Sequence, residues 1–328
     1  MRRRELTALL GGAVAAWPLA TGAQVPQKTA RIGYIGSNRD NPVFVAGSRA
    51  FLDELRRSGF VEGHNLLVEH RSTEQDIQAV FTAASELIRL NVDVLVAGGP
   101  EIALQAALRA SRTIPIVIMA TNYDPLARGY VQSLSKPGGN VTGLFVRQIE
   151  LAEKQVELLS EALPGRTRLA ILWDRLSIDQ FTSAEKRADA LGIDVRSTKL
   201  ENPPYDYAAA FEAMAQDGAQ MLFVASSPFF TAARLRLAEL ALQHRLPTMF
   251  IFKFYVKAGG LLSYGSHIEN TYRRLGAQTA KVLNGADPAN IPIEQPTTYE
   301  LVINLKTARA LGIELPSSLL ARADEVIE

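Results

Sequence analysis

The sequence predicts an α/β protein of two lobes, each built on a parallel sheet, with a hinge between them that the chain crosses three times. Short apolar strands alternate with amphipathic helices along most of the chain, which is typical of parallel sheets flanked by helices. The 328 residues correspond to about two domains of roughly 150 residues each. Hydrophobic residues make up 47% of the chain and charged residues 21%, as expected for a protein with a sizeable core.

The first 23 residues (1–23) have the pattern of an export signal rather than of a folded element. Three consecutive arginines follow Met1, and residues 6–20 are largely apolar. Residues 21–23 are Thr-Gly-Ala, which supplies the small residues that a cleavage site requires. A disordered tail or a first core helix is the alternative. About 15 apolar residues are too few to span a bilayer comfortably. The chain has no cysteine, which excludes a lipid anchor on an N-terminal Cys. We expect an exported, soluble periplasmic protein.

The first Rossmann-like lobe is predicted to open with the strand Arg31–Ile35 and a polar loop. Asn41 then caps a helix that has Pro42 at its first position, and Gly59 ends that helix. The same alternation predicts, in order, the strand Asn65–Glu69, a helix over 77–88, the strand Val92–Ala97, the helix Pro100–Ala110 and the strand Pro115–Met119.

Past Gly143 the alternation resumes and predicts a second Rossmann-like lobe. Its expected helices are Ile149–Leu163, Ser177–Leu191, Tyr207–Gln216 and Phe230–His244, and its expected strands are Arg168–Trp173, Ile193–Thr198, Met221–Ala225 and Pro247–Ile251. The tail adds the strand Gly259–Tyr264, the helix Ile268–Leu283, the strand Tyr299–Asn304 and two short helices, Thr307–Leu311 and Leu319–Asp324.

A weak internal repeat supports two similarly built lobes. Arg31–Ser37 resembles Arg168–Asp174, and the strand end at Gly98–Pro100 resembles the one at Ser226–Pro228. The alternative explanation is that all α/β proteins share the same alternation of strands, turns and helices.

Three Gly/Pro-rich boundaries predict where the chain passes between the lobes. They are Gly138–Asn140, Tyr264–Ser266 and Gln295–Thr297. We expect lobe 1 to comprise 30–143 and 266–296, and lobe 2 to comprise 144–265 and 297–328.

Ligand chemistry is expected where the carboxyl ends of the strands and the helix N-termini converge. Gly98 and Gly99 let a ligand approach the backbone, and the helix that begins near Pro100 points its N–H groups outward. This favours a carboxylate or another anion, although ordinary helix capping uses the same residue types. The candidate binding residues are Ser37, Asn38, Gly98, Gly99, Pro100, Thr121, Asn122, Asp124, Trp173, Asp174, Ser226, Ser227, Phe252 and Tyr264.

Three of these candidates have structural alternatives. Asp124 either accepts a hydrogen bond from a ligand amine or caps a turn. Trp173 either forms a wall for an apolar ligand or belongs to the core of its lobe, and Phe252 has the same two readings.

Signatures of other functions are absent from the sequence. It contains no Gly-x-Ser-x-Gly, His-Glu-x-x-His or Gly-x-Gly-x-x-Gly motif and no phosphate loop. The four histidines have no metal-ligand spacing, and a net charge of +1 gives no broad footprint for nucleic acid. We therefore expect a protein that is not an enzyme and that has no catalytic residue, metal or cofactor.

Six stretches of the chain are similar to one known family. They are Arg31–Gly36, Gly59–Asn65, Val92–Gly99, Lys136–Gly143, Ala258–Gly265 and Glu294–Ala308. Together they resemble the ABC-transporter substrate-binding proteins related to tryptophan- and tyrosine-binding proteins, over about residues 30 to 328. The resemblance implies a type I periplasmic-binding-protein fold, ligand capture at the strand-end loops between two lobes, and delivery to a permease and its ATPase.

Two loops depart from the family pattern although Asp124–Pro125 is retained. Asn122–Tyr123 stands where many relatives have small residues, and Trp173–Arg175 replaces a loop of the Asn-Pro type. These departures leave open whether the ligand is an aromatic amino acid.

These observations predict a monomeric periplasmic solute-binding protein of an ABC importer. It would capture a small organic ligand, an amino acid or another carboxylate, with the anionic group at Gly99–Pro100 and polar groups at Asn122, Asp124 and Asp174. Its partners would be that ligand, the ABC permease and the ATPase, and it would bind no nucleic acid. The alternatives are a binding protein that feeds a sensor or chemoreceptor, and a periplasmic two-domain α/β enzyme.

Overall fold

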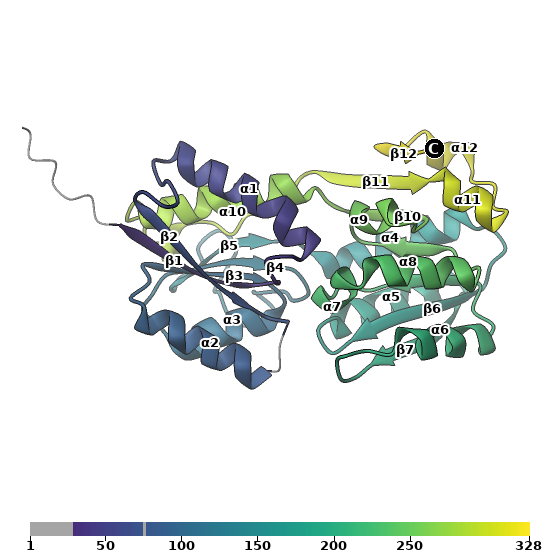
Figure 1. Cartoon of the computed structure of the whole chain (residues 1–328), viewed down its shortest axis with the longest axis horizontal. Helices are drawn as coiled ribbons and strands as arrows, with labels where there is room; N and C mark the ends of the chain where they lie inside the picture. The colour runs from purple at the N-terminus through teal and green to yellow at the C-terminus, as the bar shows by residue number, and fades with distance from the viewer. Residues whose placement is uncertain (1–28, 75–76) are drawn as a thin grey trace, which may run out of the picture.

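Two α/β lobes lie side by side along the long axis of the computed structural model (Figure 1). The structure describes residues 29–74 and 77–328. The export signal predicted over 1–23 lies outside the described residues. In the described part of the chain, no helix is long and apolar enough to cross a membrane.

Lobe 1 is a five-stranded parallel sheet with helices on both faces. Its strands run in the order β2-β1-β3-β4-β5. They are β1 (Ala30–Gly36), β2 (Leu66–Ser72), β3 (Val94–Gly99), β4 (Ile116–Ala120) and β5 (Val141–Phe145). The helices are α1 (Pro42–Arg57) and α10 (Ile268–Leu283) on one face, and α2 (Ile77–Arg89) and α3 (Glu101–Ala110) on the other (Figure 1).

The alternation of side chains along β3 explains why both faces are covered. Val94 and Val96 pack with α1 and α10, whereas Leu95 and Ala97 pack with α2 and α3. A strand that is buried on both faces reads as one continuous apolar run, and β3 has that composition. The sheet therefore points its strand ends, rather than either face, toward lobe 2 (Figure 1).

Lobe 2 is a seven-stranded sheet in the order β12-β11-β10-β9-β8-β6-β7. Its strands are β6 (Arg168–Asp174), β7 (Asp194–Leu200), β8 (Met221–Val224), β9 (Thr248–Phe250), β10 (Leu262–Ser266), β11 (Tyr299–Asn304) and β12 (Glu325–Ile327). Its helices are α4 (Gln148–Ala162), α5 (Ile178–Ala190), α6 (Tyr207–Gln216), α7 (Pro228–Ala232), α8 (Arg234–Gln243), α9 (Lys253–Lys257), α11 (Leu305–Leu311) and α12 (Ser317–Leu320).

The chain passes between the two sheets at three places. It leaves β5 for α4, leaves β10 for α10, and returns from α10 to β11. Helix α10 therefore follows a strand of lobe 2 but packs against α1 on lobe 1 (Figure 1). Strand β11 enters antiparallel to β10, so the sheet of lobe 2 is mostly but not entirely parallel.

Three element predictions are corrected. The helix expected over Phe230–His244 is two helices, α7 and α8, separated at Ala233. Strand β5 was not predicted, because its glycine and threonine interrupt the apolar run, and the boundary Gly138–Asn140 lies within lobe 1, between β4 and β5, rather than at the first crossing. Residues 325–327 form β12, which pairs with β11, where the sequence predicted only a short helix ending at Asp324.

Candidate ligand-binding cleft

A cleft lies between the lobes where the strand ends of both sheets meet. In this arrangement it leaves about 50 Å³ of space. Its lining comprises Ser37, Asn41, Val43, Gly98, Gly99, Pro100, Met119, Thr121, Asn122, Val146, Gln148, Ser226, Ser227, Pro228, Thr231, Phe252, Ser266, Ile268, Thr271 and Tyr272. Both lobes and helix α10 contribute, and the lining residues carry no formal charge.

Nine of the candidate binding residues line this cleft. They are Ser37, Gly98, Gly99, Pro100, Thr121, Asn122, Ser226, Ser227 and Phe252. Each follows or ends a strand, so parallel topology brings them to one edge of each sheet. Because the two edges face each other, loops more than 100 residues apart in sequence meet, as Asn122 and Ser226 do.

The N-terminus of α3 supplies backbone donors to the cleft. Pro100 occupies the N-cap position with an extended backbone and makes no side-chain capping bond. The first N–H groups of a helix have no partner within the helix, and the helix dipole favours negative charge there. Gly99 has φ +102, a conformation that favours glycine, and a Cβ there would meet nothing within 4 Å. The backbone is therefore open to an anionic group.

Asp174 lies behind the cleft and holds Ser227. Its Oδ2 accepts hydrogen bonds from Ser227 Oγ at 2.5 Å and Tyr205 OH at 3.2 Å, and its Oδ1 accepts from Leu176 N and Ser177 Oγ. Burial raises the pKa of this carboxyl above its usual range, and the four hydrogen bonds act in the opposite direction. Asp174 thus orients a hydroxyl of the lining without reaching the cleft itself.

The other predicted candidates also lie outside the lining. Asn38 bonds to Glu74 through its N and Nδ2 atoms. Asp124 Oδ1 accepts from Leu126 N and Ala127 N, which is a turn cap. Trp173 stacks on Phe181 at 4.5 Å and donates from Nε1 to Ser197 Oγ. Tyr264 stacks on Tyr299 at 6.1 Å in lobe 2.

Several lining residues were not predicted from the sequence. Asn41 was assigned only to capping. It does cap α1 through Val43 N, but its Nδ2 also donates to Pro228 O of lobe 2 at 3.2 Å. Gln148 follows β5, so recognising that strand was the signal that would have placed it at a strand end. Thr271 and Tyr272 come from α10, whose return to lobe 1 gives no local signal.

Polar contacts hold the lobes together around the cleft. Arg128 of lobe 1 pairs with Asp179 of lobe 2 at 2.6 Å, and Asn122 donates to two carbonyls of lobe 2. The apolar cluster also continues across, from Val43 and Ile268 to Phe230 and Phe252. The two lobes are therefore in a closed arrangement.

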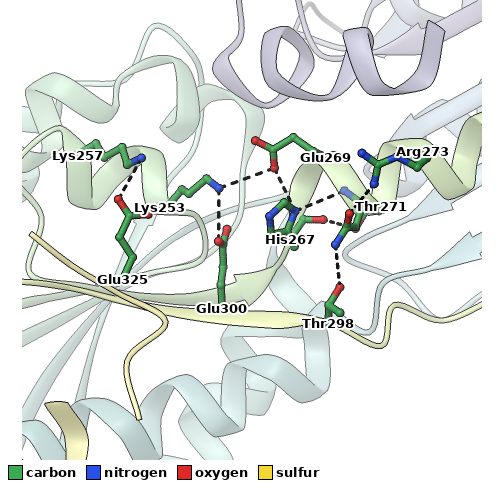
Figure 2. A network of polar contacts seen from close by, with 10 residues as sticks. Lys253, Lys257, His267, Glu269, Thr271, Arg273, Thr298, Glu300 and Glu325 are labelled. Atoms are coloured by element: carbon green, nitrogen blue, oxygen red, sulfur yellow. Dashed lines mark hydrogen bonds and ion pairs between the residues drawn. The ribbon is translucent and has the colours of Figure 1, made fainter. Parts of the chain in front are cut away.

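A polar network surrounds the crossings at β10–α10 and at β11 (Figure 2). Lys253 of α9, whose side chain is 14% exposed, lies 3.8 Å from Glu269 of α10 and 3.4 Å from Glu300 of β11. His267 caps α10 through its Nδ1, which accepts from Asn270 N. The neighbours Ser266 and His267 thus separate, one into the cleft and the other into this network.

A second cavity, of about 200 Å³ and with aromatic walls, lies in lobe 1. Tyr34, Phe44, Phe51 and His70 form its walls, with the Tyr34 and His70 rings stacked at 5.5 Å. Tyr272 borders both this cavity and the cleft. Among the described residues, no group of three or more His, Cys, Asp or Glu side chains is arranged to hold a metal ion.

Known proteins are similar to this chain in sequence or in structure. A curated tyrosine-binding protein of Clostridioides difficile is 23% identical over 278 residues, which are 84% of this chain and 79% of that protein. A conserved domain protein of Vibrio cholerae superposes with a TM-score of 0.82 at 26% identity, covering 91% of this chain and all of that one. The predicted fold class of two lobes with mostly parallel sheets is confirmed.

A solved ABC domain from Streptococcus pneumoniae, in complex with L-Trp, has a TM-score of 0.81 at 24% identity. It covers 92% of this chain and 100% of its own. The family model described as ABC transporter substrate binding protein matches residues 41–327, nearly the whole described chain. The resemblance found in the sequence is therefore confirmed, and the chain belongs to the ABC transporter substrate-binding protein family.

Proposed function

We propose that this protein captures an amino acid between its lobes and delivers it to an ABC permease and its ATPase. The observation that carries the proposal is the combination of backbone donors at the start of α3 with neutral polar side chains around them. A carboxylate meets the N–H groups near Pro100, while hydroxyl and amide oxygens of the lining accept from an ammonium group. The relatives named for tyrosine binding and solved with L-Trp support this ligand class.

The proposal includes the location and architecture of the protein. The signal-like residues 1–23 and the family membership support export to the periplasm. We also propose that the protein acts there as a monomer. We place 30–143 and 266–296 in lobe 1, and 144–265 and 297–328 in lobe 2, except that residues 144–145 stay with β5 in the sheet of lobe 1 and Ser266 stays with β10 in the sheet of lobe 2. Ligand binding stabilises the closed arrangement, which engages the permease.

The proposal also assigns binding rather than catalysis to the cleft. Its lining has no charged side chain, and Asp174 behind it is committed to four internal hydrogen bonds. No converging acid and base are thus available at the place where the ligand would bind.

A thermal-shift screen of the purified mature protein tests the function. Amino acids and small carboxylates are added singly, and the expected result is a higher Tm with at least one amino acid. Isothermal titration then gives a stoichiometry of about one, and the compound is recovered unchanged after prolonged incubation. An unchanged Tm with the whole panel, together with turnover of any compound, would contradict the proposal.

A further inference from the structure

Asn122 spans the cleft from lobe 1 to lobe 2 with its side-chain amide. Its Nδ2 donates to the carbonyl oxygen of Leu176 at 2.9 Å and to that of Ser226 at 2.7 Å. An amide nitrogen has two N–H donors, so these two bonds use both of them. Asn122 follows β4 of lobe 1, whereas its partners follow β6 and β8 of lobe 2. One side chain therefore joins strand-end loops of both sheets.

The oxygen of the same amide is free to accept from a ligand. Asn122 is 7% exposed, and its buried Oδ1 has no hydrogen-bond partner among the described residues. Gln148, which is 1% exposed and also lines the cleft, has an unpartnered Oε1. Burying an acceptor without a donor is costly. An ammonium or hydroxyl group of the ligand would satisfy these oxygens.

The space beside Asn122 limits the size of that ligand. The cleft leaves about 50 Å³, whereas an engineered cavity that binds benzene has about 150 Å³. An indole is larger than benzene, so L-Trp does not fit the space that this closed arrangement leaves beside Asn122. A compact ligand can instead keep both bonds.

We propose that Asn122 determines specificity: it confines the ligand to compact amino acids, accepts a hydrogen bond from their ammonium group, and excludes aromatic ones such as L-Trp. The inference rests on the proposed function and names the ligand class within it. The residue thereby couples recognition to closure, because its oxygen contacts the ligand while its nitrogen holds lobe 2.

Isothermal titration of three proteins with four ligands tests the proposal. The proteins are the wild type, Asn122→Ala and Asn202→Ala, the last an exposed asparagine in a loop of lobe 2 outside the cleft. The ligands are glycine, L-alanine, L-serine and L-Trp. The wild type and Asn202→Ala should bind a compact amino acid at least about tenfold more tightly than L-Trp. In Asn122→Ala the compact ligand should lose about tenfold in affinity and L-Trp should gain.

Asn122→Ser provides a second variant that keeps a polar group if the alanine variant fails to fold. The proposal is overturned if the wild type binds L-Trp as tightly as the best compact ligand. It is equally overturned if both variants leave the ratio of the two affinities unchanged. In these cases the proposed function stands. If no amino acid of either size binds the wild type, the proposed function fails and this inference fails with it.

Discussion

At Gly143 in β5, one added methyl group would clash with the backbone of the neighbouring strand β4. A Cβ there would lie 2.2 Å from Ile118 O and 2.5 Å from Ile118 N, and φ is +130. Gly143→Ala should therefore lower the free energy of unfolding by about 3 kcal/mol, or prevent folding. Urea denaturation measures this, with Gly139→Ala as the control because its Cβ would meet nothing within 4 Å. Equal midpoints for the two variants would contradict the close approach of β4 and β5.

Asp174 tests whether a buried carboxylate organises the cleft from behind. Asp174→Ala removes the acceptor of four hydrogen bonds and should lower the free energy of unfolding by about 3 kcal/mol. It should also weaken ligand binding, because Ser227 loses its orientation. Asp287→Ala, which removes two exposed hydrogen bonds, from Ala289 N and from Asn290 Nδ2, should cost about 1 kcal/mol and leave affinity unchanged. Unaltered affinity in the first variant would exclude a positioning role.

His70 gives the stability of lobe 1 a defined pH dependence. Burial lowers its pKa, and the charges of Arg39 and Arg71 act in the same direction against the bond that Nε2 makes to Ser37 O. Because the folded pKa is depressed, this contribution to stability is present above the unfolded value of about 6.5 and is lost as pH falls through the folded pKa.

The pH prediction is checked by urea denaturation at several pH values between about 7.5 and 5. The wild type should lose stability relative to His70→Gln as the pH falls through this window. His64→Gln supplies a control for the substitution itself, since His64 is exposed. A difference between wild type and His70→Gln that does not change with pH would contradict the assignment.

At the scale of elements, the ion pair between the loop after β4 and helix α5 connects the lobes directly. Arg128 and Asp179 side chains are 45% and 31% exposed, so their pair contributes about 1 kcal/mol or less. Arg128→Ala should weaken ligand binding by up to about fivefold, and less at high salt. Arg322→Ala breaks a pair with Glu161 inside lobe 2 and should leave affinity unchanged. The same affinity in both variants would show that the Arg128 pair does not favour closure.

Elements with strong local patterns were predictable, and elements set by distant partners were not. Helix α6 has the predicted bounds, Tyr207–Gln216, because Asp206 caps it. Strand β12 has three residues and exists through pairing with β11, so no period in the sequence indicates it. Strand β5 contains Gly143, which the close approach to Ile118 requires and which hides the strand pattern.

The residues of the candidate site also fall into those that local pattern predicts and those that depend on distant packing. Glycine, serine and threonine at strand ends follow from parallel topology, and nine such candidates line the cleft. The position of α10 is decided by packing on α1, so Thr271 and Tyr272 could not be placed from local pattern. Asp124 and Trp173 had polar or aromatic character at strand ends, but a turn cap and a stacked core position account for them.

At the scale of the whole molecule, the two sheets place their strand ends toward one another and α10 joins them. This arrangement leaves one cleft between the strand ends, and there we propose that the ligand is selected. The sequence predicted two lobes and repeated crossings, but it contained no information on how far the lobes close. That closure depends on contacts such as Asn122 to Ser226, which exist only in the assembled molecule.

A crystal structure of the protein with a compact amino acid bound tests the central claim most directly. The account predicts one ligand between the N-terminus of α3 and Ser227, contacted by both lobes, with its ammonium group at Asn122 Oδ1. Ligand density in the aromatic cavity beside Tyr34 and His70, or contact with one lobe only, would contradict capture in the interlobe cleft.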